Sequence, residues 1–293
     1  MSKAIIDPTA QAELDLGDQA AERNLLDRLL SDSKRYQSSQ DYQDLLDFII
    51  RLRNMAPFNA MLLQIQKPGL SYAASEYDWE VHFERKIKDR ARPLLIMWPF
   101  GPVALVYDLL DTDGPELPKD AFAFYAKGAI DEVRMETFKG ILYRKQIHPK
   151  YFDHGDKNAG YICRLTFSED KKVFSKYELG LNKNHSAAQN FATLIHELGH
   201  LFLGHLGEDR KLRIQDRRGL PHRQEEIEAE SIAYIICRRN DIECSSPKYL
   251  HGHVNSGDRA EHLDLYAITR AAGHIERLLQ LSRSSEWFTN TKI

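Results

Sequence analysis

Two histidines and a glutamate in the stretch TLIHELGHLFLGH, residues 193–205, have the spacing of a metal site. His196 and His200 are four positions apart, so on an α-helix they share one face, with Cβ atoms about 5–6 Å apart. Two imidazoles at that separation can bind one Zn²⁺ through nitrogens about 2.0–2.1 Å from the ion. Glu197 lies at another angle around the helix, where its carboxylate could act as a general base toward water. The spacing therefore predicts a hydrolytic zinc site, and the alternative is a polar helix without metal.

The residues around this motif predict the helix that carries it. Ser186-Ala-Ala-Gln189 fits a capping box, so we expect the helix to begin there and to run to Gly204. Gly199 would allow a neighbouring backbone to approach closely. Burial of polar side chains is costly unless something pairs with them, and a metal ion would do so. The apolar residues expected to bury this helix are Phe191, Leu194, Ile195, Leu198 and Phe202.

A catalytic zinc ion needs a third protein ligand and one open position. A second predicted helix, EEIEAESIAYIICRRN at 225–240, offers two acids on one face, Glu226 and Glu230. The small residues Ala229 and Ala233 would let this helix approach the first one. The spacing alone leaves both acids open as the third ligand.

Three further polar groups lie near these motifs in the sequence. Glu228 points elsewhere on its helix, and we expect it to be a solvated acid. His205 follows His200 by five residues, about 140° around a continuous helix, so we do not expect it to bind the same metal. His251 and His253 stand with Tyr249 in SSPKYLHGHVN. They are interpreted as surface histidines, and the alternative is a loop that polarises a substrate carbonyl.

Periodicity and turn residues predict the other elements. The expected helices are 9–36, 41–54, 58–69 and 258–282. The expected strands are 93–98, 103–110, ILYRKQIH at 141–148, GYICRLTF at 160–167 and FSKYELGLN at 174–182. A linker at 111–120 and a charged connection at 207–222 complete the pattern. We therefore predict an α+β protein with a small N-terminal α/β domain at 1–118 and a metal-bearing domain at 119–293.

Composition limits the function classes. The chain has 293 residues and a formal net charge of −3, which argues against strong indiscriminate binding to nucleic acid or anionic membranes. No apolar run is long enough for a membrane span, and the first residues lack the apolar core of a secretory signal. The 3 cysteines lack CxxC spacing, which indicates neither a disulfide framework nor a cysteine zinc cluster. We expect a cytoplasmic protein with no membrane partner, and the sequence does not indicate an oligomeric state.

The combination of QNFATLIHELGH, EEIEAESIAYIIC and SSPKYL resembles the ImmA/IrrE family of metallopeptidases, and still more the zincin domain of ArdC-type antirestriction proteins. The resemblance covers roughly residues 160–280. It implies a zincin-like domain of the Glu-zincin type, with an HExxH helix and a Glu-bearing helix. By that pattern Glu226 is the third zinc ligand, and Glu230 orients a histidine ligand through a hydrogen bond.

The N-terminal half resembles the ArdC N-terminal domain through FNAMLLQIQKPGLSYAASEYDWEVHFERKIK, PLLIMWP and VALVYDLLDTDGPELP. It departs from that pattern where Glu84-Arg85 replaces Gly-Arg and KDRAR replaces a Lys-Gly-rich turn. The resemblance implies single-stranded DNA binding. RKIKDRAR at 85–92 carries five basic residues beside aromatic ones, a combination that can hold phosphates and stack bases. The expected DNA-binding residues are Trp79, Arg85, Lys86, Lys88 and Arg90, and the alternative is a solvated charge run beside core aromatics.

These observations give three hypotheses for function. The first is a zinc metallo-endopeptidase that hydrolyses a protein substrate, which could be associated with DNA. The second is a single-stranded DNA-binding, antirestriction-like protein with a structural or regulatory zinc domain. The third is an interaction module with an inactive site, which would have no need of Glu197.

Overall fold

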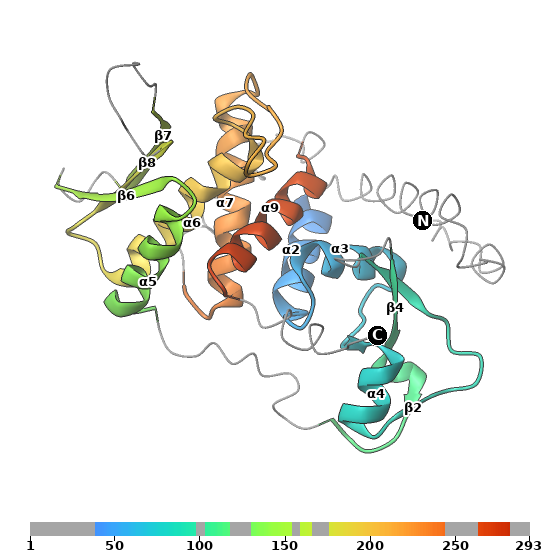
Figure 1. The fold of residues 1–293 in the computed structure, drawn as a ribbon. Helices are drawn as coiled ribbons and strands as arrows, with labels where there is room; N and C mark the ends of the chain where they lie inside the picture. Colours follow the sequence, from blue (N-terminus) through green and yellow to red (C-terminus); the bar gives the residue numbers. More distant parts are fainter. Residues whose placement is uncertain are drawn as a thin grey trace. The chain divides into compact units, whose positions relative to one another are not determined.

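The computed structural model describes residues 39–97, 103–117, 130–153, 159–165, 176–243 and 263–281 (Figure 1). The chain folds into two compact units. The described residues of the first unit lie within Leu62–Leu117, and those of the second lie within Tyr36–Met61 and Pro118–Ile293. Residues 39–61 thus group with the part of the chain that carries the HELGH motif, although they precede the described residues of the first unit in sequence. The helix expected at 9–36 lies outside the described residues.

The first unit contains two small antiparallel sheets. Strands β1 (Ala73–Ala74), β4 (Ala104–Asp108) and β3 (Leu94–Ile96) form one of them in the order β1-β4-β3. The adjacent pairing of β3 and β4 confirms the two neighbouring strands predicted from the apolar runs. Strand β2 (Lys86–Ile87) pairs with β5 (Thr112–Asp113), so part of the predicted linker is a strand. Helix α4 (Glu76–Phe83) begins at Ser75, whose side chain accepts a hydrogen bond from the backbone N–H of Asp78.

The second unit contains a mixed sheet in the order β6-β8-β7. The central strand β8 (Tyr177–Asn182) runs parallel to β6 (Ile147–Phe152) and antiparallel to β7 (Gly160–Arg164). Strands β7 and β8 confirm two of the three predicted strands. The third prediction, at 141–148, is wrong in its first half because helix α5 (Glu132–Tyr143) extends into it. The buried residues of α5 recur at helical spacing and form one packed face: Met135, Phe138, Ile141 and Leu142.

Helices α6 (Ala187–Leu203), α7 (His222–Arg239) and α9 (Leu265–Leu278) pack against one another in the second unit (Figure 1). The close approach of α6 and α7 depends on small residues. A Cβ atom added to Gly199 would lie 3.3 Å from Cα of Ala229, tighter than most contacts. Glycine and alanine at this crossing therefore bring the two predicted metal-binding helices together.

A buried arginine joins α7 to its neighbours in the second unit. Arg239 donates hydrogen bonds to the carbonyls of Ile49 and Met55, at 2.7 and 2.9 Å, and pairs with Glu276 at 2.6 Å. These contacts hold helix α2 (Ser39–Arg51) and α9 against α7. Burial of this charge is tolerated because the guanidinium is paired and hydrogen bonded.

Helix α3 (Pro57–Gln66) spans the division between the two units. With helices and small sheets in both units, the predicted α+β class is confirmed. Within the described ranges, no helix combines the length and apolar character needed to cross a lipid bilayer.

Candidate metal centre

Helix α6 begins and ends where the sequence predicts. The Ser186 side chain accepts from the backbone N–H of Gln189 at 3.3 Å, and the Gln189 side chain accepts from the backbone N–H of Ser186 at 2.9 Å. Gly204 ends the helix with a φ of 83°, a left-handed conformation that glycine adopts without steric cost. These local contacts fix the helix that carries the HELGH motif.

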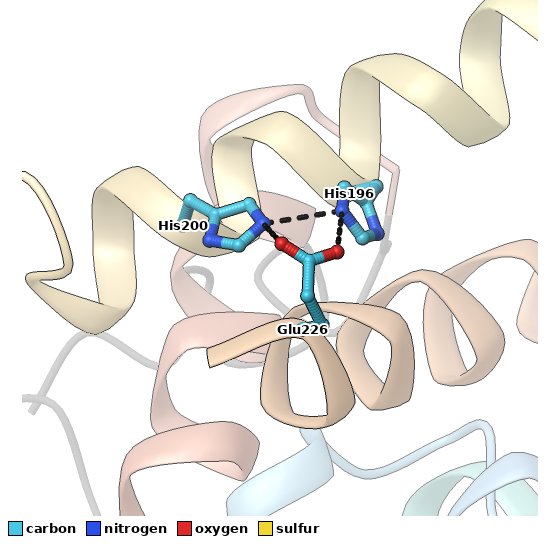
Figure 2. Close-up of side chains that lie close together, drawn as sticks. All are labelled: His196, His200 and Glu226. Carbon is cyan, nitrogen blue, oxygen red and sulfur yellow. Dashed lines mark hydrogen bonds and ion pairs between the residues drawn. The ribbon is translucent and has the colours of Figure 1, made fainter. Parts of the chain in front are cut away.

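The two histidines of the motif and one glutamate of α7 form a compact cluster (Figure 2). The Nε2 atoms of His196 and His200 are 3.1 Å apart. Glu226 points between them, with one carboxylate oxygen 3.5 Å from Nε2 of His196 and the other 3.4 Å from Nε2 of His200. All ligand atoms lie within 4.8 Å of one another, close enough to hold one metal ion. Two imidazoles and a carboxylate are a donor set that suits a catalytic zinc ion.

The second acid of α7 lies on another side of the cluster. Nδ1 of His196 donates a hydrogen bond to Glu230 at 2.9 Å, which leaves Nε2 of the same ring facing Glu226. Burial disfavours the charged imidazole, but the hydrogen bonds with Glu226 and Glu230 raise the pKa of His196 to about 10. The hydrogen bond with His196 in turn lowers the pKa of Glu226 well below its usual range. Glu226 and Glu230 thus contact different nitrogens of the same ring.

Glu197 faces strand β7 beside the cluster. A Cβ atom added to Gly160 would lie 3.7 Å from Cγ of Glu197, so the strand passes directly over this side chain. Burial raises the pKa of Glu197 to about 7, against a lowering by His196 and by a backbone hydrogen bond from Ile162. A carboxylate in such surroundings can accept a proton near neutral pH.

The expectation that Glu228 is a solvated acid is wrong. Its side chain is fully buried, and the guanidinium of Arg217 donates two hydrogen bonds to its carboxylate, at 2.7 and 2.9 Å. The prediction failed because Arg217 belongs to the charged connection before α7, and helix periodicity does not reveal such a partner.

His205 takes a position that the sequence did not suggest. It is buried, and its Nδ1 lies 2.9 Å from Nδ1 of His200. It does not belong to the metal-binding cluster, as expected. The reason differs from the one given by helical geometry, because α6 has ended before this residue. The signal available in the sequence was Gly204, which predicts the end of the helix and hence a change of direction.

Two of the expected DNA-binding residues have structural roles in the first unit. Trp79 is fully buried, and its indole N–H donates to the carbonyl of Tyr107 at 2.9 Å. A ring in this position cannot stack on a base, so the prediction for Trp79 is wrong. The Arg85 guanidinium donates to the side chain and the carbonyl of Thr112, at 2.7 and 2.9 Å, and to the carbonyls of Gly114 and Pro115. These contacts hold β5 and the chain after it, and they use four of the five N–H donors of the guanidinium.

The other three expected DNA-binding residues, all in the stretch 85–92, are exposed. Lys86 and Arg90 lie at the surface, and Lys88 contacts the carbonyl of Leu110 at 2.9 Å. Tyr77 on α4 is also exposed. Elsewhere, the segment with Tyr249, His251 and His253 lies outside the described residues, so its predicted role stays a prediction.

A comparison with known protein families agrees with one of the resemblances seen in the sequence. Residues 156–237 match the model of the Peptidase M78 family, described as an IrrE N-terminal-like domain. These residues include both histidines, Glu197 and Glu226, so the resemblance to the ImmA/IrrE family is confirmed over this segment.

Solved structures of the antirestriction protein ArdC from plasmid R388 are also similar to the chain. The Mn(II)-bound form has 15% identity and a TM-score of 0.41, and the match covers 92% of this chain and 99% of ArdC. The metal-free form has 15% identity and a TM-score of 0.36, with 86% and 99% covered. A search of curated protein sequences finds no match.

Proposed function

We propose that the chain is a zinc metallo-endopeptidase that hydrolyses peptide bonds of a protein substrate. The observation that carries this proposal is the cluster of His196, His200 and Glu226, with Glu197 beside it on the same helix. The match of residues 156–237 to a peptidase family model supports the same class of activity. Zinc is the metal we infer because two imidazoles and one carboxylate form a ligand set used by zinc peptidases.

In this proposal, each polar residue of the site has one task. His196, His200 and Glu226 bind the ion, and Glu230 keeps the hydrogen of His196 on Nδ1 so that Nε2 is free to coordinate. A bound zinc ion would supply a Lewis acid for the water and the substrate carbonyl. Glu197 accepts a proton from the attacking water and delivers it to the leaving nitrogen as the C–N bond breaks.

The position of β7 supports a peptide as the substrate class. Among the described strands, β7 pairs on one side only, with β8, and lies over Glu197. An edge strand offers unpaired backbone groups to which an extended peptide can bind as an additional strand. A scissile bond held along this edge would lie near the proposed general base.

Metal analysis and a general protease assay test this proposal. The purified chain should contain near one zinc ion per molecule and should cleave fluorescein-labelled casein. A chelator should abolish the cleavage, and added Zn²⁺ should restore it. The same preparation of His196→Ala serves as the control for contaminating proteases. Absence of bound metal in the wild-type chain would contradict the proposal.

The exposed basic segment favours single-stranded DNA as a second binding partner. Lys86, Lys88 and Arg90 reach solvent in the first unit, and Tyr77 supplies an exposed ring nearby in sequence. Such groups can hold phosphates and stack a base without reading sequence. The DNA proposal does not involve Trp79 or Arg85, whose side chains have structural roles.

Binding of a labelled oligo-dT to the full chain tests the DNA proposal by fluorescence anisotropy. The logarithm of the affinity should fall linearly with the logarithm of the salt concentration. The slope should have a magnitude of about 0.7 for each phosphate contact. Changing Lys86, Lys88 and Arg90 together to Gln should flatten that slope. Changing the exposed Arg144 and Lys145 of the second unit to Gln should leave it unchanged. We expect the chain to bind single-stranded DNA more tightly than duplex DNA, and equal affinity for the two would contradict the proposal.

A further inference from the structure

A third histidine, His205, lies beside the candidate metal ligands and is buried. His205 contacts His200 through the two Nδ1 atoms, at 2.9 Å. Nε2 of His200 faces Glu226 and Nε2 of His196, so in the proposed site this nitrogen keeps its lone pair for the metal ion. The hydrogen of His200 therefore resides on Nδ1, and Nδ1 of His205 must accept it.

This assignment determines the tautomer of His205. Because Nδ1 of His205 accepts, the neutral imidazole carries its hydrogen on Nε2. Nε2 of His205 lies 3.4 Å from a carboxylate oxygen of Glu228, which can accept that hydrogen. The two hydrogen bonds then run in one direction: His200 donates to His205, and His205 donates to Glu228.

Glu228 is itself held from the other side. Besides the two hydrogen bonds from Arg217, its carboxylate accepts one from the side chain of Gln224 at 3.1 Å. These contacts and full burial fix the carboxylate, and the guanidinium balances its charge. Glu228 is therefore a rigid acceptor for the hydrogen of His205.

The backbone conformation that places His205 here is built into the end of α6. Gly204 turns the chain out of the helix, and the N–H of His205 donates to the carbonyl of His200 at 3.1 Å. The N–H of Arg217 donates to the carbonyl of Gly204, also at 3.1 Å. The segment from Gly204 to Arg217 thus places His205 against His200, and it places Arg217 against Glu228.

From these contacts we infer that His205 is a positioning residue for the metal site, with Glu228 and Arg217 as its anchor. It holds the ring of His200 in the orientation and tautomer that direct Nε2 toward the metal. The ring of His196 is oriented directly by the carboxylate of Glu230. The ring of His200 is instead oriented by the neutral ring of His205. This inference rests on the proposed binding of metal by His196, His200 and Glu226.

Zinc affinity of the full chain tests the inference, measured by competition with a chromophoric chelator. His205→Leu removes the acceptor and should weaken Zn²⁺ binding about 10–100-fold, the usual effect of losing such a partner. His205→Asn places an amide oxygen near the position of Nδ1 and should restore most of the affinity. His274→Leu is the matched control. The ring of His274, on α9, packs against Phe202 of α6, with 5.8 Å between the ring centroids, and does not touch the cluster.

A spectroscopic measurement separates positioning from a merely structural role. In the ¹⁵N-histidine-labelled, zinc-loaded wild-type chain, both His196 and His200 should show an exchange-protected Nδ1–H. His205→Leu should remove this protection from His200 alone. The melting temperature of each metal-free variant shows whether a lost affinity merely follows lost stability. If His205→Leu does not fold, the wild-type spectrum and the zinc affinity of His205→Asn still test the inference.

Three outcomes would overturn the inference: a His200 hydrogen on Nε2, unchanged zinc affinity in His205→Leu, or no recovery in His205→Asn. In each of these cases the wild-type chain still binds zinc, and the proposed function stands. A wild-type chain that binds no zinc would instead remove the proposed function, and this inference with it.

Discussion

Glu230 lies 2.9 Å from Nδ1 of His196, the ring nitrogen that faces away from His200. Glu226, one helical turn earlier on α7, lies 3.5 Å from Nε2 of the same ring. Two acids that spacing alone left equivalent thus contact opposite sides of one imidazole. Their positions predict different roles. Nε2 of His196 faces Nε2 of His200, so only Glu226, on that side of the ring, can bind the same ion as both histidines.

Substitution of the two acids should therefore have unequal effects. Glu226→Ala removes a ligand and should empty the site under mild chelation, as His196→Ala or His200→Ala should. Glu230→Ala removes only the hydrogen-bond acceptor of His196 and should weaken metal affinity by about 10–100-fold. Zinc retained after dialysis against increasing chelator measures the order. Loss of metal in Glu230→Ala but not in Glu226→Ala would reverse the two roles.

Glu197→Gln should separate metal binding from hydrolysis. The amide keeps the shape of the side chain but cannot accept the proton of the attacking water, so casein cleavage should fall by about 10²–10⁴-fold. Zinc content and melting temperature should match those of the wild-type chain. A variant that loses its zinc would show instead that this carboxylate coordinates the ion.

Asp209 should make folding sensitive to acid. Burial disfavours its charge, but Lys176, with Nζ at 2.6 Å, and the hydroxyl of Tyr177, at 2.7 Å, lower the pKa of this carboxyl below its usual value. The stabilisation is therefore complete above the pKa of the unfolded chain, about 3.9, and is lost as pH falls through the lower folded-state pKa.

Urea unfolding of wild type and Asp209→Asn between pH 3 and 7, with a chelator present, measures this effect. The difference in unfolding free energy should be largest near neutral pH and should shrink below about pH 4. Glu208→Gln, at the exposed neighbouring position, is the control and should show a small difference at every pH. A constant offset for Asp209→Asn would contradict the assignment.

Trp79→Ala should act through stability. Removal of a fully buried aromatic side chain typically costs about 3–5 kcal/mol, and this ring also contacts Tyr72 and Phe83. Tyr77→Ala, on the exposed side of the same helix, should change the unfolding free energy little. Thermal unfolding distinguishes the two variants. Equal stability of both would mean that Trp79 is not part of the core.

Gly204 and Gly219 provide a matched pair for the turn that positions His205. Both have a left-handed φ, 83° and 93°, so alanine at either position is strained by about 1 kcal/mol. A Cβ atom at Gly204 would also lie 1.9 Å from the carbonyl oxygen of Gln215, whereas Gly219 faces open space. Gly204→Ala should therefore destabilise the protein more than Gly219→Ala, as measured by urea unfolding.

The local sequence of α6 determined the helix and the arrangement of its two histidines. A capping box, a terminal glycine and an interval of four residues act within one or two helical turns, so they can be predicted without knowledge of the fold. The same holds for the two acids of α7, which helical periodicity placed on one face. The beginning of β6 was less predictable, because the apolar residues at 141–142 suit a buried helix as well as a strand.

Tertiary structure alone decided which side chains the other polar and aromatic residues contact. Periodicity tells which residues share a face, but not which element covers that face. Glu228 is buried because Arg217 comes from a connection with no regular pattern, and Trp79 is buried because Tyr107 comes from a strand 28 residues away. His205 reaches His200 only because the helix ends between them. Such partners depend on how the chain returns upon itself, and the free energy of burying a charge or a ring depends on those partners.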